Sequence, residues 1–185
     1  MPEYSTNDLT SKDEHEAFYA QGSDRAIAIL LGSIVENRLT ALLERKMCQE
    51  PWLHETKKNL LRPSGPLGSF GTKLHLAATF SFISQFMWRE LQTVIKIRNK
   101  FAHDLTVRDF QSAKIADLIK KLETYEIVQT IARRYPEGAV HVSGIRFGES
   151  VVNDYRLCIA YYISGLRHAE EGDCYTAPSF GYFDT

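Results

Sequence analysis

Residues 24–48 read DRAIAILLGSIVENRLTALLERKMC, and this stretch decides the fold class. Its apolar residues recur at steps of three and four, the spacing that lines one face of an α-helix. They are Ile27, Leu30, Leu31, Ile34, Val35, Leu39, Leu42 and Leu43. Ser23 or Asp24 can cap the helix, because a short side-chain oxygen accepts an orphan backbone N–H group. The stretch therefore predicts one long core helix.

The same periodicity predicts further helices on both sides of this segment. They cover about 8–20 (weakly), 52–60, 71–84, 87–103, 107–122 and 150–168, with a kinked continuation of the fifth to Arg134 left open. Thr106 is the expected cap of the helix at 107–122, with Asp109 in the capping-box position. The stretch 139–147 alternates partly and predicts either a short hairpin or an ordered loop. Short connections favour antiparallel neighbours, so we expect an all-α, up-and-down bundle of five to seven helices.

Length and composition are those of one ordinary soluble domain. The chain has 185 residues, of which 44% are hydrophobic and 24% charged, and its formal net charge is −1. We expect a single domain over 1–185 with its core at about 23–168, an acidic N-terminal segment at 1–22 and an aromatic tail at 173–185. The longest nearly apolar run, 26–35, is about half of the roughly 20 residues that a membrane helix needs. Three scattered cysteines form no disulfide framework and indicate a reducing cytoplasm.

Charge is uneven along the chain. Residues 96–134 carry nine basic against five acidic residues, a net of +4. These charges are either solvated helix faces or a basic surface for an anionic partner.

The sharpest local feature is Arg98-Asn99-Lys100-Phe101-Ala102-His103. Asn99 and His103 are four residues apart and share a helix face, whereas Arg98 points toward the apolar side. A guanidinium there needs acceptors, and Glu36 of the long helix is the first candidate, with Asp104 nearby on another face. Two interpretations stay open. Either an Arg–carboxylate pair joins two helices, or Arg98 holds a phosphate while Asn99 orients it and His103 moves a proton.

The Pro- and Gly-rich stretch 63–73 is a second candidate site. Its backbone N–H groups could approach an anion at the start of the helix near Thr72 and Lys73. The alternative is a tight connection that fixes the angle between two helices. No spaced set of His and Cys residues predicts a metal, and no cofactor is expected.

The pattern from Arg98 to His103 resembles the Arg-x(4–6)-His motif of the HEPN superfamily, helical proteins that often dimerise and include metal-independent ribonucleases. A wider resemblance is to the mannitol operon repressor family. It is carried, in order and spacing, by SDRA at 23–26, LGSIVENRL at 31–39, PSGPLGSFGTK at 63–73 and IRNKFAHDL at 97–105.

This resemblance implies a bacterial cytoplasmic regulator, HEPN-like and homodimeric, that acts through a protein partner or RNA. Direct DNA readout is not expected, because the sequence shows no helix-turn-helix with a basic second helix. The alternative is a metal-independent endoribonuclease that uses Arg98, Asn99 and His103. The candidate binding residues are Glu36, Lys73, Lys100 and Asp104.

Overall fold

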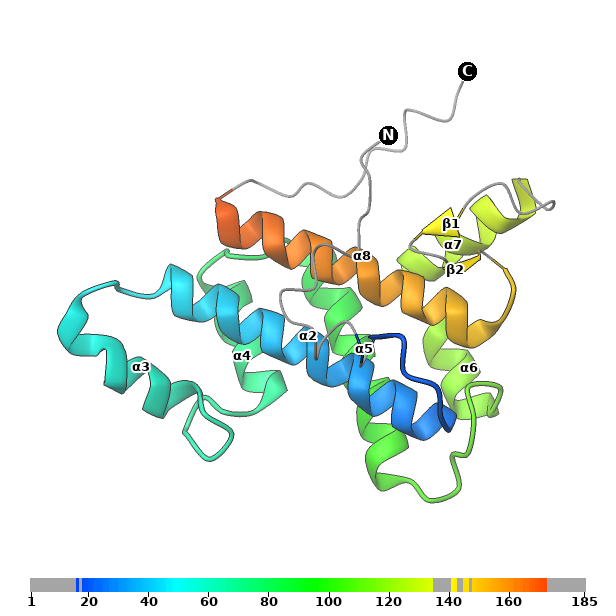
Figure 1. Ribbon diagram of the computed structural model, residues 1–185, viewed down its shortest axis with the longest axis horizontal. Coiled ribbons are helices and arrows are strands. Elements are labelled where there is room, and N and C mark those ends of the chain that lie inside the picture. The colour runs from blue at the N-terminus through cyan, green and yellow to red at the C-terminus, as the bar shows by residue number, and fades with distance from the viewer. Residues whose placement is uncertain (1–15, 17, 135–140, 143–144, 147, 173–185) are drawn as a thin grey trace.

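The computed structural model describes residues 16, 18–134, 141–142, 145–146 and 148–172 (Figure 1). Seven α-helices lie in this part of the chain: α2 (Asp24–Lys46), α3 (His54–Leu61), α4 (Phe70–Thr79), α5 (Gln85–His103), α6 (Ala113–Ile119), α7 (Glu123–Arg134) and α8 (Val151–Glu171). One 3-10 turn, η2 (Pro51–Leu53), precedes α3. The predicted all-α helical bundle is confirmed.

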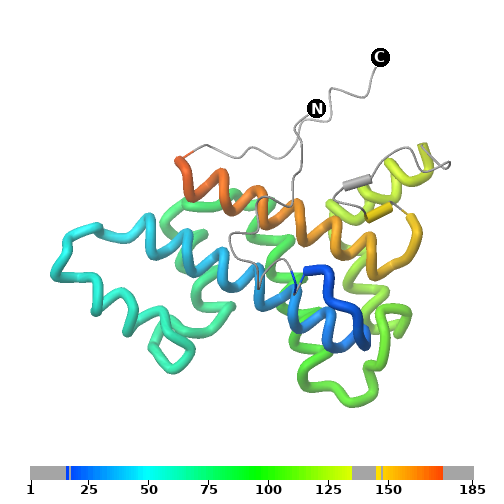
Figure 2. Tube along the Cα trace, in the orientation of Figure 1, coloured from blue at the N-terminus to red at the C-terminus, as the bar shows by residue number. Residues whose placement is uncertain are grey.

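Helix α2 is the core of this bundle. It packs against α8, α5 and α4, and ten of its residues are buried. Figures 1 and 2 show α2 and α8 lying side by side and running in the same direction, with α5 crossing behind them. Because neighbours cover α2 on several sides, its apolar residues are spread more widely than the single stripe of a surface helix.

The length and composition of α2 would also allow it to cross a membrane, which the short apolar run 26–35 did not reveal. Its mean hydropathy over 18 residues is 1.6, and 56% of that window is buried inside the bundle. Core helices of soluble proteins have this same character, and the contacts of α2 are those of a core helix.

Serine side chains define where the helices begin. Ser23, Ser69, Ser84 and Ser150 each accept a hydrogen bond from the backbone N–H three residues further along. Each bond satisfies one donor that the first turn of a helix leaves without a partner. At the other end of α8, Gly172 adopts the left-handed conformation with φ 101° that commonly closes a helix. Ser23 is one of the two caps that the sequence predicted for the long helix, the other being Asp24.

Helix α4 ends at Thr79, five residues before the predicted end at 84. Ser81 adopts a left-handed conformation with φ 55°, and the N–H of Phe82 returns to the carbonyl of Ala77 at 2.8 Å. This pair of features is the closing turn that glycine usually makes, and the sequence offers no glycine there to signal it.

The predicted helix at 107–122 is wrong at both of its ends. Residues 104–112 form turns, α6 covers only Ala113–Ile119, and α7 starts as a separate helix at Glu123. Thr106 is not a helix cap, because its hydroxyl and its N–H both donate to the Asp104 carboxylate. Asp109 accepts from the N–H of Ser112 at 2.7 Å and so supports the turn before α6.

A buried carboxylate of α5 explains why α7 begins where it does. Glu90 is 2% exposed and accepts hydrogen bonds from the N–H groups of Glu123 (3.2 Å) and Thr124 (3.0 Å). Tyr162 of α8 donates its hydroxyl to the same carboxylate at 2.8 Å. Glu90 therefore caps α7 from another helix and joins α5, α7 and α8, which no local pattern announces.

Within the stretch 139–147, the described residues form two paired strands, which fits the hairpin, one of the two predicted forms. Strand β1 (His141–Val142) pairs antiparallel with β2 (Ile145–Arg146). Most of the weak helix predicted at 8–20 and the whole tail 173–185 lie outside the described residues. The end of that predicted helix, at residues 18–20, is bound to α8, because Arg156 donates to the carbonyls of Phe18 and Ala20.

Candidate functional site

The C-terminal half of α5 carries the predicted site residues. Asn99, Lys100 and His103 are exposed there, and Arg98 is half-buried. The guanidinium of Arg98 donates through Nη1 to Oδ1 of Asn99 at 2.9 Å. Asn99 and His103 lie on the exposed side of the helix, as their spacing of four predicts.

The Arg98 stem is fixed by its close approach to α2. A Cβ atom added at Gly32 would lie 2.8 Å from Cγ of Arg98. Only glycine leaves room for this side chain at the crossing of α2 and α5. Nε of Arg98 is buried without a hydrogen-bond partner, while the rest of the guanidinium turns outward to Asn99.

The carboxylate predicted for Arg98 is bound elsewhere. Glu36 accepts from Nζ of Lys73 at 3.3 Å, and this ion pair ties α2 to α4. The expectation that Glu36 pairs with Arg98 is wrong, since Lys73 reaches that carboxylate from α4. Lys73 is only 4% exposed, so this internal pair leaves it little surface for a ligand.

The loop before α4 is packed against its own backbone. Cβ atoms added at Gly65 and Gly68 would lie 2.3 Å from the carbonyl oxygens of Asn59 and Arg62. The N–H of Leu67 donates back to the carbonyl of Leu60 at 3.0 Å. These contacts favour a tight interhelical connection over a loop open to an anion.

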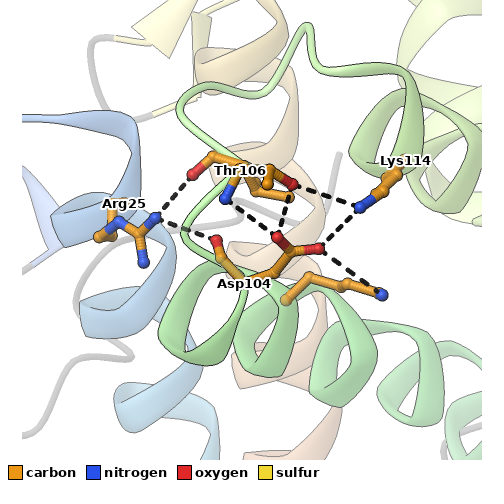
Figure 3. Close-up of polar contacts among 6 residues, drawn as sticks. Arg25, Asp104, Thr106 and Lys114 are labelled. Carbon is orange, nitrogen blue, oxygen red and sulfur yellow. Dashed lines mark hydrogen bonds and ion pairs between the residues drawn. The ribbon is translucent and has the colours of Figure 1, made fainter.

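Asp104 closes α5 and organises the turn that follows (Figure 3). Its Oδ1 accepts from the N–H (3.0 Å) and hydroxyl (2.6 Å) of Thr106, and its Oδ2 accepts from Nζ of Lys114 at 2.9 Å. Nζ of Lys100 lies 4.0 Å from the same Oδ2. The Thr106 and Lys114 hydrogen bonds hold the pKa of Asp104 well below its ordinary value, because they favour the ionised carboxylate. Two predicted binding residues, Lys100 and Asp104, are thus brought together.

Arg25 is the residue at this end of the bundle that sequence reasoning missed. Its guanidinium donates to the carbonyls of Phe101, Asp104 (3.1 Å) and Val107 (2.7 Å), two of which Figure 3 shows. The carboxylate of its neighbour Asp24 accepts from the N–H of Phe110 at 2.8 Å. The sequence carries one signal of this role. A cation in the first turn interacts unfavourably with the positive end of the helix dipole, which suggests that its partner lies outside its own helix.

We call residues 104–112 the clamped loop, since side chains of α2 hold it at several points. Two residues of the loop, Val107 and Phe110, are buried, and Phe110 packs on Phe101 of α5 with ring centroids 4.9 Å apart. The loop lacks regular secondary structure, yet its backbone is fixed by hydrogen bonds and by its apolar anchors.

A metal centre was not expected, and the described residues contain no group of three His, Cys, Asp or Glu side chains that could hold a metal ion. Cys158 is buried in α8, and burial raises the pKa of its thiol well above the ordinary value. A thiol in that state is a packed core group and a poor nucleophile.

The fold places this chain among all-helical bundle proteins, and comparison with known families narrows the class. The sequence model of the family described as "Mannitol repressor" (MtlR) matches residues 16–142, or 127 of the 185 residues. The chain therefore belongs to the mannitol repressor family. No match was found among the curated proteins.

Two solved structures share the fold. A chain of the MtlR–HPr complex from Escherichia coli is 15% identical with a TM-score of 0.63, over 84% of this chain and 99% of that one. YggD from Shigella flexneri 2a str. 2457T, described as a possible transcriptional regulator, is 18% identical with a TM-score of 0.68, over 85% of this chain and 97% of that one.

Proposed function

We propose that this chain is a cytoplasmic regulator of gene expression that acts by binding an HPr-type protein partner and not by reading DNA itself. The observation that carries the proposal is the family match over 16–142, together with a fold shared with a chain of an MtlR–HPr complex. Because the likeness covers nearly the whole of that chain, this protein has the same bundle available for a partner.

The placement of the cations supports action without a DNA-reading helix. Recognition helices present residues near their N-termini to the major groove. Near the start of α5, Arg89 is paired with Glu123 at 3.0 Å. The exposed Lys96, Lys100 and His103 lie in the C-terminal half, and the clamped loop lies beyond them. The negative end of the helix dipole is also at this end, which disfavours a phosphate there.

The test is a pair of binding measurements on the purified full chain. We expect saturable binding of HPr from the source organism in isothermal titration calorimetry. We also expect no sequence-selective retention of promoter DNA in gel shifts at about 0.15 M salt, where non-specific phosphate contacts are screened. Selective DNA binding by the chain alone would contradict the proposal, as would the absence of HPr binding.

A second candidate function is a metal-independent endoribonuclease. It is favoured by one observation: Arg98 donates to the Asn99 amide, and no carboxylate among the described residues pairs with it, while Asn99 and His103 are open to solvent. Arg98 would stabilise charge on the scissile phosphate, Asn99 would orient it, and His103 would act as general acid or base.

The composite site implied by the HEPN resemblance needs a homodimer, which we propose for this chain and which light scattering after size exclusion tests. Cleavage of defined RNA strands in EDTA, lost in His103→Ala, would establish the ribonuclease. Equal rates for the variant and the unchanged chain would remove His103 from any reaction.

A further inference from the structure

The core helix α2 leaves one of its faces uncovered. From residue 26 to residue 44 ten residues are buried, and nine are exposed or half-buried. Eight of these nine fall within an arc of about 120° around the helix, since successive residues are about 100° apart. The ninth, Glu36, lies at the edge of the arc and is paired with Lys73. The eight residues, which we call the α2 stripe, are Ala26, Ile29, Leu30, Ser33, Asn37, Thr40, Ala41 and Glu44.

The α2 stripe has little charge for a surface. Seven of its eight residues are uncharged, and the exception, Glu44, lies at one end. Leu30 is 37% exposed, and only 56% of the most apolar 18-residue window of this helix is buried inside the bundle. A continuous apolar face that the chain's own helices leave open indicates a contact with another molecule.

The hydroxyl groups of the α2 stripe are already satisfied within the helix. Oγ of Ser33 donates to the carbonyl of Ile29 at 3.0 Å, and Oγ1 of Thr40 donates to the carbonyl of Glu36 at 2.8 Å. Covering these hydroxyls therefore leaves no donor without a partner. Asn37, near the middle of the stripe, is exposed, and its amide can both donate and accept.

These features fit a second copy of the chain. In a two-fold contact the same face meets itself, so a charged face would repel its copy and an uncharged one does not. Homodimer interfaces are also more apolar than those of partners that bind and separate. Two Asn37 amides that meet near the axis can bond to each other, because each offers a donor and an acceptor.

The α2 stripe borders the predicted site on α5. Ser33 follows Gly32, the residue over which the stem of Arg98 lies. Ile95 and Ala102 are half-buried and, at three residues before and four after Arg98, lie on the same side of α5. A copy that docks on the stripe brings its own Arg98 beside the same interface, which the composite site described above requires.

We propose that the α2 stripe is the interface of a homodimer whose two-fold axis passes near Asn37. This inference rests on the homodimer proposed with the ribonuclease alternative, since it assigns the surface through which that dimer forms. Neither RNA cleavage nor HPr binding has to occur for it to hold.

The test measures the dimer dissociation constant of the full chain by analytical ultracentrifugation. Leu30→Glu should raise this constant about a hundredfold or more, because each dimer would then bury two unpaired charges. Asn37→Asp keeps the shape of the side chain, and we expect a rise of about tenfold at pH 7 and less near pH 4, where the carboxylates take up protons. Phe80→Glu, at a 60% exposed apolar position beyond the end of α4, is the matched control. It should stay within about twofold of the unchanged chain.

The other outcomes separate the dimer from its surface. A monomeric unchanged chain would overturn both the homodimer and the assignment of the α2 stripe. A dimer that persists equally in Leu30→Glu and Asn37→Asp would leave the homodimer standing and overturn the stripe alone. An intact dimer that loses HPr binding in Leu30→Glu would also overturn it, because the stripe would then belong to that partner. Circular dichroism checks that each variant is folded, and if Leu30→Glu is not, the exposed Asn37→Asp decides.

Discussion

The clamped loop and the α3 region are opposite cases, because the segment without regular secondary structure is the one whose backbone other elements hold in place. The clamped loop has no regular elements, yet Arg25, Asp24 and Asp104 fix its backbone. The α3 region consists of the 3-10 turn η2 and the regular helix α3, and Leu61 is the one residue of these two elements that is buried. In Figure 1, α3 lies at the left end of the molecule, far from the α5–α6 connection.

This difference teaches that tertiary hydrogen bonds, not helix content, decide which exposed apolar side chain stands on a fixed backbone. Leu105 and Trp52 are both highly exposed, at 85% and 74%. Only Leu105 is flanked by backbone groups that other elements hold. Four substitutions test the comparison.

The largest effect should come from the anchor of α3. Leu61→Ala removes the buried side chain that attaches this helix, and we expect the free energy of unfolding to fall by about 2–5 kcal/mol. Urea denaturation measures the change, and hydrogen exchange should show that the α3 amides lose protection first. Leu60→Ala, at the partly exposed neighbouring position, is the control and should cost clearly less. Equal losses for the two variants would mean that α3 is held differently.

Removing the guanidinium that clamps the loop should rank second. Arg25→Ala leaves three carbonyl groups without their donor, and we expect a loss of about 2–3 kcal/mol, because bonds to charged donors are the stronger ones. Exchange of the amides at 104–110 should increase while those of α8 stay protected. Arg45→Ala is the control, since that side chain is 60% exposed and its ion pair spans 3.8 Å. It should change stability by about 0.5 kcal/mol or less.

A smaller, pH-dependent effect should come from Asp104→Asn. The folded state lowers the pKa of Asp104 from its ordinary value of 3.8, so this carboxylate stabilises the fold above that pH. The stabilisation is lost as the pH falls below about 4 and approaches the lower folded pKa, because only the unfolded chain takes up the proton at first. The variant should therefore melt at a lower temperature than the unchanged chain at pH 7, and the gap should narrow in acid.

Asp117→Asn is the control for that experiment, since Asp117 is an exposed carboxylate on α6. Its melting temperature should follow that of the unchanged chain at each pH. A gap for Asp104→Asn that stays constant from pH 7 to strong acid would show that the carboxylate charge does not hold the loop.

The smallest effect should come from Trp52→Ala. A side chain that is 74% exposed has little area to lose, so we expect a change of about 0.5 kcal/mol or less in the free energy of unfolding. A loss above about 1 kcal/mol would show that Trp52 anchors η2 and would remove the contrast with Leu105. Tryptophan fluorescence, compared with a Trp88→Phe variant, would show how far the solvent reaches Trp52.

The sequence predicted the helices well wherever one helix buries its own periodic face. The long helix predicted at 24–48 and a cap at Ser23 or Asp24 follow from local spacing and local hydrogen bonding; the helix is confirmed, and Ser23 is the cap. The segment 107–122 failed because its apolar residues belong to a loop, to the short helix α6 and to the connection that separates α6 from α7. The break between them depends on Glu90, which approaches from another helix.

The candidate site was predicted in part. The exposure of Asn99 and His103 on one face follows from their spacing, whereas their roles stay predictions. The partner of Glu36 could not be chosen, because Arg98 and Lys73 are both cations within reach of the same helix in a bundle of unknown packing. In the folded bundle, Lys73 is the cation that lies within ion-pair distance of the Glu36 carboxylate.

The sequence by itself therefore determined the all-α class, most helix starts and the family, because those depend on residues close together in the chain. Tertiary structure alone decided which charged groups meet: Glu36 with Lys73, Glu90 with the start of α7, and Arg25 with the end of α5 and the clamped loop, 76 to 82 residues away. The reason is physical. Helix propensity and capping act within a turn or two, whereas a buried charge pairs with whichever partner the packing brings within hydrogen-bond distance.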